Sequence, residues 1–138
     1  MSAWVSAALA AEVAARAGGR CEYCHAPQIL IGQAFHIDHI LPQSRGGRSE
    51  SANLCLACSH CNIAKSGRSE ARDPRTGRVV RLFNPRRDLW TKHFPWSPNG
   101  TMLIGKTVIA RATVSALDMN AELLRAARPF WRWAGLVP

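Results

Sequence analysis

Two CxxC pairs constrain this 138-residue chain more than any other feature. The first pair is Cys21 and Cys24, and the second is Cys58 and Cys61. Each CxxC turn can present two thiolates to one ion, and Zn²⁺ prefers four soft ligands in a tetrahedron. Four cysteines leave no open coordination position, so we expect a structural zinc rather than a catalytic one. We call each CxxC turn a knuckle. Disulfide bonds and a redox CxxC are the competing interpretations, but neither suits two paired knuckles in a chain that we expect in a reducing compartment.

The charge of the chain favours a polyanionic partner. The formal net charge is +9, most of the basic residues are arginine, and the excess is concentrated between Arg45 and Lys92. Arginine binds phosphate oxygens with a planar fork, so this excess indicates a nucleic acid. A merely soluble basic protein is the alternative that charge alone leaves open.

The chain carries no sign of a membrane partner. No segment reaches the roughly 18 apolar residues that span a bilayer. The Ala-rich start could suggest a signal peptide, but Glu12 and Arg16 interrupt it and no basic stretch precedes it. We therefore expect an N-terminal helix and a cytoplasmic protein, either nucleoid-associated or phage-encoded.

Hydrophobic patterns predict a small α+β fold. We expect helices over 3–17, 59–65, 107–117 and 121–133, and a β-hairpin or two short strands over 33–41. Residues 73–77 indicate a turn before a strand over 78–83, and residues 87–93 a helical turn. Asn99-Gly100 predicts a hairpin between 94–96 and 102–104. The last predicted helix carries three arginines at near-helical spacing, Arg125, Arg128 and Arg132. They form either a stripe that faces DNA or an ordinary solvated face.

The segment between the two knuckles is the most informative part. It contains Asp38-His39-Ile40, then Pro42-Gln43-Ser44, a glycine-containing loop, Asn53-Leu54 and finally CNIAKSG from Cys61. This ordered set, over Arg20 to Gly67, resembles the zinc-binding subgroup of the HNH endonuclease family. Asn62 stands where many members have histidine, which makes the chain an HNN variant. The resemblance implies a ββα-metal (His-Me finger) core, flanked here by the N-terminal helix and a C-terminal hairpin plus helices.

The resemblance also implies a catalytic site for DNA phosphodiester hydrolysis. Asp38 and Asn62 would hold Mg²⁺ or Mn²⁺, because carboxylate and amide oxygens suit hard cations. His39 should point to the opposite strand face from Asp38 and serve as the general base. Asn53 would brace the loop and help to hold His39.

Several neighbouring residues are further candidates. His36 lies on the same strand face as Asp38, either as a third metal ligand or as an ordinary histidine. As a ligand it would help the site accept Ni²⁺ or another softer ion. Arg45, Arg48 and Lys65 are candidate phosphate contacts, although the two arginines could equally be solvated loop charges.

We therefore predict a metal-dependent endonuclease that nicks DNA or cuts it with little sequence specificity. The chain is treated as one domain, 1–138, with a zinc-stapled core at 20–67 and an extension at 78–138. Double-stranded DNA is the expected partner, and a homodimer or a larger nucleic-acid-processing complex is compatible with the sequence. The alternatives are a non-catalytic zinc-containing DNA-binding module and a nuclease subunit of a phage packaging or restriction assembly.

Overall fold

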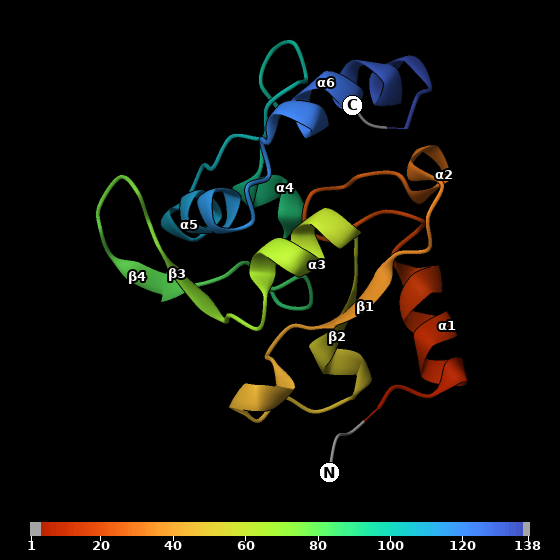
Figure 1. The fold of residues 1–138 in the computed structure, drawn as a ribbon. Helices are drawn as coiled ribbons and strands as arrows, with labels where there is room; N and C mark the ends of the chain where they lie inside the picture. Colours follow the sequence, from red (N-terminus) through yellow and green to blue (C-terminus); the bar gives the residue numbers. More distant parts are fainter. Residues whose placement is uncertain (1–3, 137–138) are drawn as a thin grey trace. The chain divides into compact units, whose positions relative to one another are not determined.

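A computed structural model describes residues 4–136, which form two compact units. Among the described residues, unit 1 comprises residues 4–69 and 84–87, and unit 2 comprises residues 70–83 and 88–136. Figure 1 shows the elements of both units, which combine helices with small antiparallel sheets. The α+β fold class is therefore confirmed. The assignment of the whole chain to a single domain stays a prediction, because compactness does not test independent folding.

Unit 1 begins with helix α1, Ala7–Arg16. The Ser6 hydroxyl caps it by accepting a hydrogen bond from the Leu9 amide at 3.1 Å. The helix was expected over 3–17, and residue 3 lies outside the described part of the chain. After Pro27 the chain forms a short helix, α2, Gln28–Ile31, which the sequence analysis did not predict.

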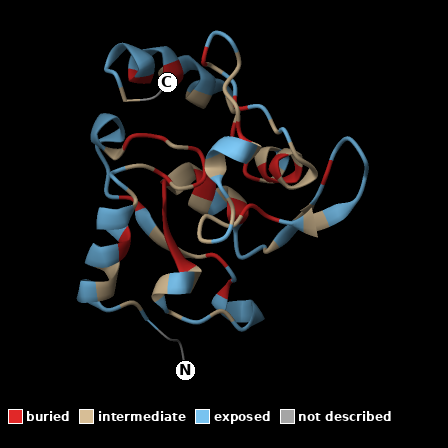
Figure 2. Ribbon diagram, turned by 180° about the vertical axis from the view of Figure 1, so that it is seen from behind, coloured by how far each residue is buried: buried red, intermediate tan, exposed pale blue. Residues whose placement is uncertain are grey.

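A two-stranded sheet and one helix make the centre of unit 1. Strand β1, His36–His39, pairs antiparallel with β2, Leu54–Ala57. All four residues of β2 are buried (Figure 2). Helix α3, Ser59–Lys65, follows β2 and packs on both strands. This β–β–α arrangement is the core that the sequence predicts.

One expectation for this region was wrong. Residues 33–41 contain one strand, β1 at 36–39, rather than a hairpin or two strands, and the partner strand comes from residues 54–57. The segment 33–41 contains no turn sequence of the Asn-Gly type. A strand without a local partner must pair with a distant one, and the apolar run before Cys58 supplies it.

In its described residues, unit 2 contains a second small sheet and three helices. Strands β3, Glu70–Arg72, and β4, Val79–Arg81, pair around the predicted turn at 73–77. Helices α4, Trp90–His93, α5, Val108–Ala116, and α6, Glu122–Trp133, follow. Strand β3 was not predicted. The predicted Asn99-Gly100 turn is closed by one bridge, between Trp96 and Leu103.

Candidate functional site

The four predicted zinc ligands form one buried cluster in unit 1. The Sγ atoms of Cys21, Cys24, Cys58 and Cys61 all lie within 4.8 Å of one another. Cys24 Sγ and Cys58 Sγ are 3.7 Å apart. A tetrahedral zinc with bonds of about 2.3 Å places its sulfurs about 3.8 Å apart, so the cluster fits this ion. In the described part of the chain, no other set of three or more histidine, cysteine or acidic side chains is close enough to hold a metal.

Backbone amides support the thiolates of this cluster. The Cys24 amide donates to Cys21 Sγ, and the Cys61 amide donates to Cys58 Sγ, each at 3.4 Å. These donors favour the charged form of sulfur, which is the form that binds a metal. The structure thus supports the prediction of a structural zinc site.

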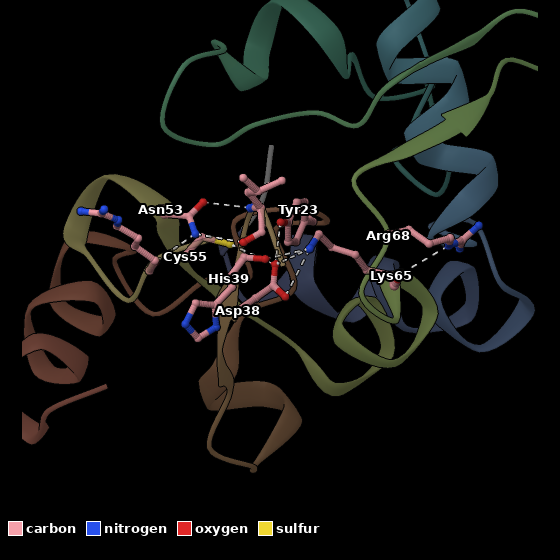
Figure 3. Close-up of polar contacts among 9 residues, drawn as sticks. Tyr23, Asp38, His39, Asn53, Cys55, Lys65 and Arg68 are labelled. Carbon is pink, nitrogen blue, oxygen red and sulfur yellow. Dashed lines mark hydrogen bonds and ion pairs between the residues drawn. The ribbon is translucent and has the colours of Figure 1, made fainter. Parts of the chain in front are cut away.

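Asp38 lies at the centre of a polar network between β1, the first knuckle and α3. Its Oδ2 accepts a hydrogen bond from the Tyr23 hydroxyl at 2.8 Å and from Cys55 Sγ at 3.8 Å. The Lys65 ammonium lies 3.2 Å from the same oxygen. Figure 3 shows the three side chains gathered at this carboxylate. Asp38 is therefore held by donors from three separate segments.

Both neutral donors of this network retain their protons. Burial, followed by the nearby Cys55 and Asp38, raises the pKa of Tyr23 well above its ordinary value. Burial, followed by the nearby Asp38, likewise raises the pKa of the Cys55 thiol. Since each group stays protonated, each can donate to the charged carboxylate.

His39 directs its ring away from this network (Figure 3). Its Nε2 is 2.8 Å from the Ser49 hydroxyl, and its backbone carbonyl accepts a hydrogen bond from Lys65 at 2.9 Å. Partial burial is the main cause that lowers the pKa of His39; Asp38 opposes this effect and Lys65 adds to it. The imidazole is therefore neutral near pH 7, as a general base must be.

Asn53 braces the loop that follows β1. Its Oδ1 accepts a hydrogen bond from the Leu41 amide at 2.8 Å. Its Nδ2 donates to the carbonyls of Leu41 and Arg48, both at 3.0 Å. Gly47 lies tightly inside this loop, because a Cβ there would meet the Leu41 carbonyl oxygen at 1.7 Å. One side chain thus ties both ends of the loop that carries Ser49.

The remaining predicted residues occupy different environments. Asn62 is half-buried on α3, one turn before Lys65. His36 is exposed and its Nε2 lies 3.0 Å from the Ser59 hydroxyl. Arg45 and Arg48 are exposed on the loop, whereas Lys65 is buried against Asp38. The roles assigned to these residues stay predictions.

Several residues of the site were not predicted. Tyr23 and Glu22 stand between the knuckle cysteines, and Ser49 lies in the polar loop. Glu22 accepts a hydrogen bond from the Leu56 amide at 2.8 Å and forms an ion pair with Arg86. The position of Tyr23 and Glu22 inside a knuckle was the only sequence signal. Their partners become evident only in the folded chain.

A β–β–α core with a four-cysteine zinc site defines the class of small zinc-stapled ββα-metal proteins. Residues 21–68 match the family model described as HNH endonuclease. The chain therefore carries an HNH domain over these residues, and the resemblance found in the sequence is confirmed. Proteins with this domain are in general nucleases, so the match indicates nuclease or nucleic-acid-binding activity. No curated protein and no solved structure matches the chain.

No helix in the described part of the chain is both long and apolar enough to cross a membrane.

Proposed function

We propose that this protein is a metal-dependent endonuclease that hydrolyses phosphodiester bonds in double-stranded DNA. The observation that carries the proposal is the arrangement of Asp38 and His39 on β1. Asp38 is held against α3 by Lys65, while the ring of the next residue points away and contacts Ser49. The proposed anionic ligand and the proposed base are therefore neighbours on β1 whose side chains have different polar partners.

Asp38 and Asn62 would hold a divalent ion such as Mg²⁺ or Mn²⁺. When bound, such an ion polarises the phosphoryl group and stabilises the leaving oxygen. Oxygen donors from a carboxylate and an amide suit these hard cations. Helix α3 packs on β1, and Asn62 precedes by one turn the lysine that reaches Asp38. This placement favours Asn62 as the second ligand.

His39 would take the proton of the attacking water. In the tautomer whose Nε2–H donates to Ser49 Oγ, the lone pair of the imidazole lies on Nδ1. Asn53 supports this geometry indirectly, because it braces the loop that includes Ser49.

Arg45 and Arg48, exposed on the same loop, would contact phosphates of the duplex. Such contacts do not read bases, so nicking or weakly specific cutting is expected.

A non-catalytic DNA-binding module is the second candidate function. The observation in its favour is the ion pair of Asp38 with Lys65, which already neutralises the carboxylate that would bind the divalent ion. A binding module, however, gives no reason for His39, Asn53 and Asn62 to occur in this order.

A supercoiled-plasmid assay separates the two candidates. Zinc-loaded wild type and His39→Ala are incubated with EDTA, Mg²⁺, Mn²⁺ or Ni²⁺. Relaxed or linear product from the wild type alone, and only with added metal, is the expected result. Binding of the plasmid without cleavage under every metal, by folded and zinc-loaded wild type, would favour the binding module.

A further inference from the structure

The two carboxylate oxygens of Asp38 have unequal surroundings. Oδ2 contacts the Tyr23 hydroxyl at 2.8 Å, Lys65 Nζ at 3.2 Å and Cys55 Sγ at 3.8 Å. Within the part of the chain that the structure describes, the polar contact of Oδ1 is with Lys65 Nζ, at 3.5 Å. Lys65 reaches both oxygens, so the short Tyr23 contact is the strongest feature that distinguishes them. Among the described residues, Oδ1 therefore has fewer hydrogen-bond donors around it than Oδ2.

The hydroxyl of Tyr23 is held in place by its position inside the first knuckle. Tyr23 is fully buried, and the cysteines on either side belong to the zinc cluster. Its neighbour Glu22 fastens the knuckle to β2, because its amide donates to the Leu56 carbonyl and its carboxylate accepts from the Leu56 amide, both at 2.8 Å. The phenol has little freedom to move relative to the sheet that carries Asp38.

We propose that Tyr23 is a positioning residue, which holds Asp38 Oδ2 so that Oδ1 faces the divalent ion of the nuclease site. The inference rests on the proposed function. It gives the zinc knuckle a second role, because the turn that binds zinc also orients the carboxylate of a separate metal site. Groups that orient metal ligands in this way commonly affect metal affinity by about 10–100-fold when they are removed.

Tyr23→Phe tests the proposal, because it removes the hydroxyl and keeps the ring that fills the core. The affinity of zinc-loaded protein for Mn²⁺ is measured by electron paramagnetic resonance titration, together with zinc content and thermal unfolding. We expect full zinc content and a Mn²⁺ dissociation constant raised about tenfold or more. An unchanged dissociation constant would overturn the proposal.

A double-mutant cycle distinguishes positioning from a general structural role. If Tyr23 acts through Asp38, Tyr23→Phe has no further effect on Mn²⁺ affinity in an Asp38→Asn background. A further loss of affinity in that background would contradict the proposal. Thr113→Val is the matched control, since it removes a buried hydroxyl in unit 2 that bonds the Phe83 amide at 2.9 Å. We expect this control to lower stability and to leave Mn²⁺ affinity unchanged.

Cleavage of plasmid is recorded separately, so that the two proposals can fail independently. Equal Mn²⁺ affinity of wild type and Tyr23→Phe, with active wild type, would remove the positioning role and leave the nuclease. Inactive wild type, with Mn²⁺ affinity that still depends on Tyr23 through Asp38, would remove the nuclease and leave the positioning role.

Discussion

In unit 1 the buried side chains Tyr23 and Lys65 converge on one carboxylate, Asp38. In unit 2 the buried Arg128 instead donates to the carbonyls of Thr101 and Met119. Burying a polar group costs free energy in both places unless it finds a partner. The first arrangement orients Asp38, the side chain that we propose as a metal ligand, whereas the second satisfies backbone groups. Burial of a charged residue therefore does not by itself mark a functional site. The groups that it contacts indicate whether its role is functional or structural.

The two units also differ in what holds them together. Unit 1 surrounds a cluster of four cysteines, whereas unit 2 has an aromatic core. In that core Phe83 and Phe94 meet edge to face at 5.0 Å, and Trp90 contacts Phe94 and Trp96 at 5.4 and 5.9 Å between ring centroids. We therefore expect the stability of unit 1, and not that of unit 2, to depend on zinc.

The largest expected effect is the loss of a zinc ligand. Cys58→Ser leaves three thiolates, and structural zinc in small domains contributes about 10–16 kcal/mol of binding free energy that is coupled to folding. We expect zinc to be lost and the amides of β1, β2 and α3 to lose their protection in hydrogen-exchange mass spectrometry. The amides of α5 should stay protected. Equal loss of protection in both units would contradict a zinc dependence confined to unit 1.

The next effect concerns the buried arginine of unit 2. Arg128 also bonds the Asn120 side chain at 2.8 Å and lies between Trp96 and Trp131, 5.4 and 5.7 Å from the ring centroids. Arg128→Met keeps an aliphatic stem but removes the buried donor to the Thr101 and Met119 carbonyls, so we expect a loss of about 3 kcal/mol in the free energy of unfolding. Chemical denaturation measures it, and zinc content should not change.

Arg125→Met is the matched control for this substitution. Arg125 is exposed on the same helix, and its side chain donates to the Asn120 carbonyl at 2.9 Å. Its loss should cost less than about 1 kcal/mol. Equal losses of unfolding free energy in the two variants would show that the buried contacts of Arg128 do not stabilise unit 2 more than one exposed hydrogen bond does.

A smaller effect is expected at Gly47 in unit 1. A Cβ at this position would collide with the Leu41 carbonyl and approach Asn53 Nδ2 at 2.9 Å. Gly47→Ala should displace the loop that carries Ser49, lower stability by about 2 kcal/mol and reduce cleavage, while zinc stays bound. Gly77→Ala is the control, since a Cβ there meets no atom within 4 Å, although its φ of +76° also strains the backbone. If Gly47→Ala cleaves DNA as fast as the wild type, the position of the loop that carries Ser49 does not affect catalysis.

The smallest effect is a pH dependence in unit 2. The Arg111 guanidinium is the main cause that lowers the pKa of Asp73, and it donates to both carboxylate oxygens, at 3.0 and 2.9 Å. Because the folded-state pKa lies below the unfolded value, the stabilisation is complete above about pH 4 and is lost as the pH falls below it. Denaturation of wild type and Asp73→Asn between pH 2 and 6 measures this. If the free energy of unfolding of the wild type falls no more steeply with decreasing pH than that of Asp73→Asn, the stabilising role of the Asp73–Arg111 ion pair is contradicted.

The sequence predicts the parts of the molecule that depend on local spacing. Helix α3 has its predicted bounds, since a cysteine cap precedes it and Ser66-Gly67 follows it in the left-handed conformation that ends helices. The two CxxC pairs predict the zinc cluster, because the ligand types and their spacing are sufficient evidence.

The parts that were missed depend on contacts between distant segments. The partner of β1 lies beyond a long loop, so no local pattern identifies it. Tyr23 contacts a carboxylate 15 residues further along the chain, and Arg128, expected on an exposed stripe, is buried. Helical spacing gives the face of a residue but not what covers that face.

The most direct test of the central claim is the single-turnover cleavage rate of zinc-loaded His39→Ala beside wild type, on duplex DNA at saturating Mn²⁺. General-base catalysis contributes about 10²–10⁴-fold, so the account predicts a fall of at least about 100-fold with unchanged zinc content and Mn²⁺ affinity. Equal rates for the two proteins would contradict the assignment of His39 as the general base, and with it the proposed active site.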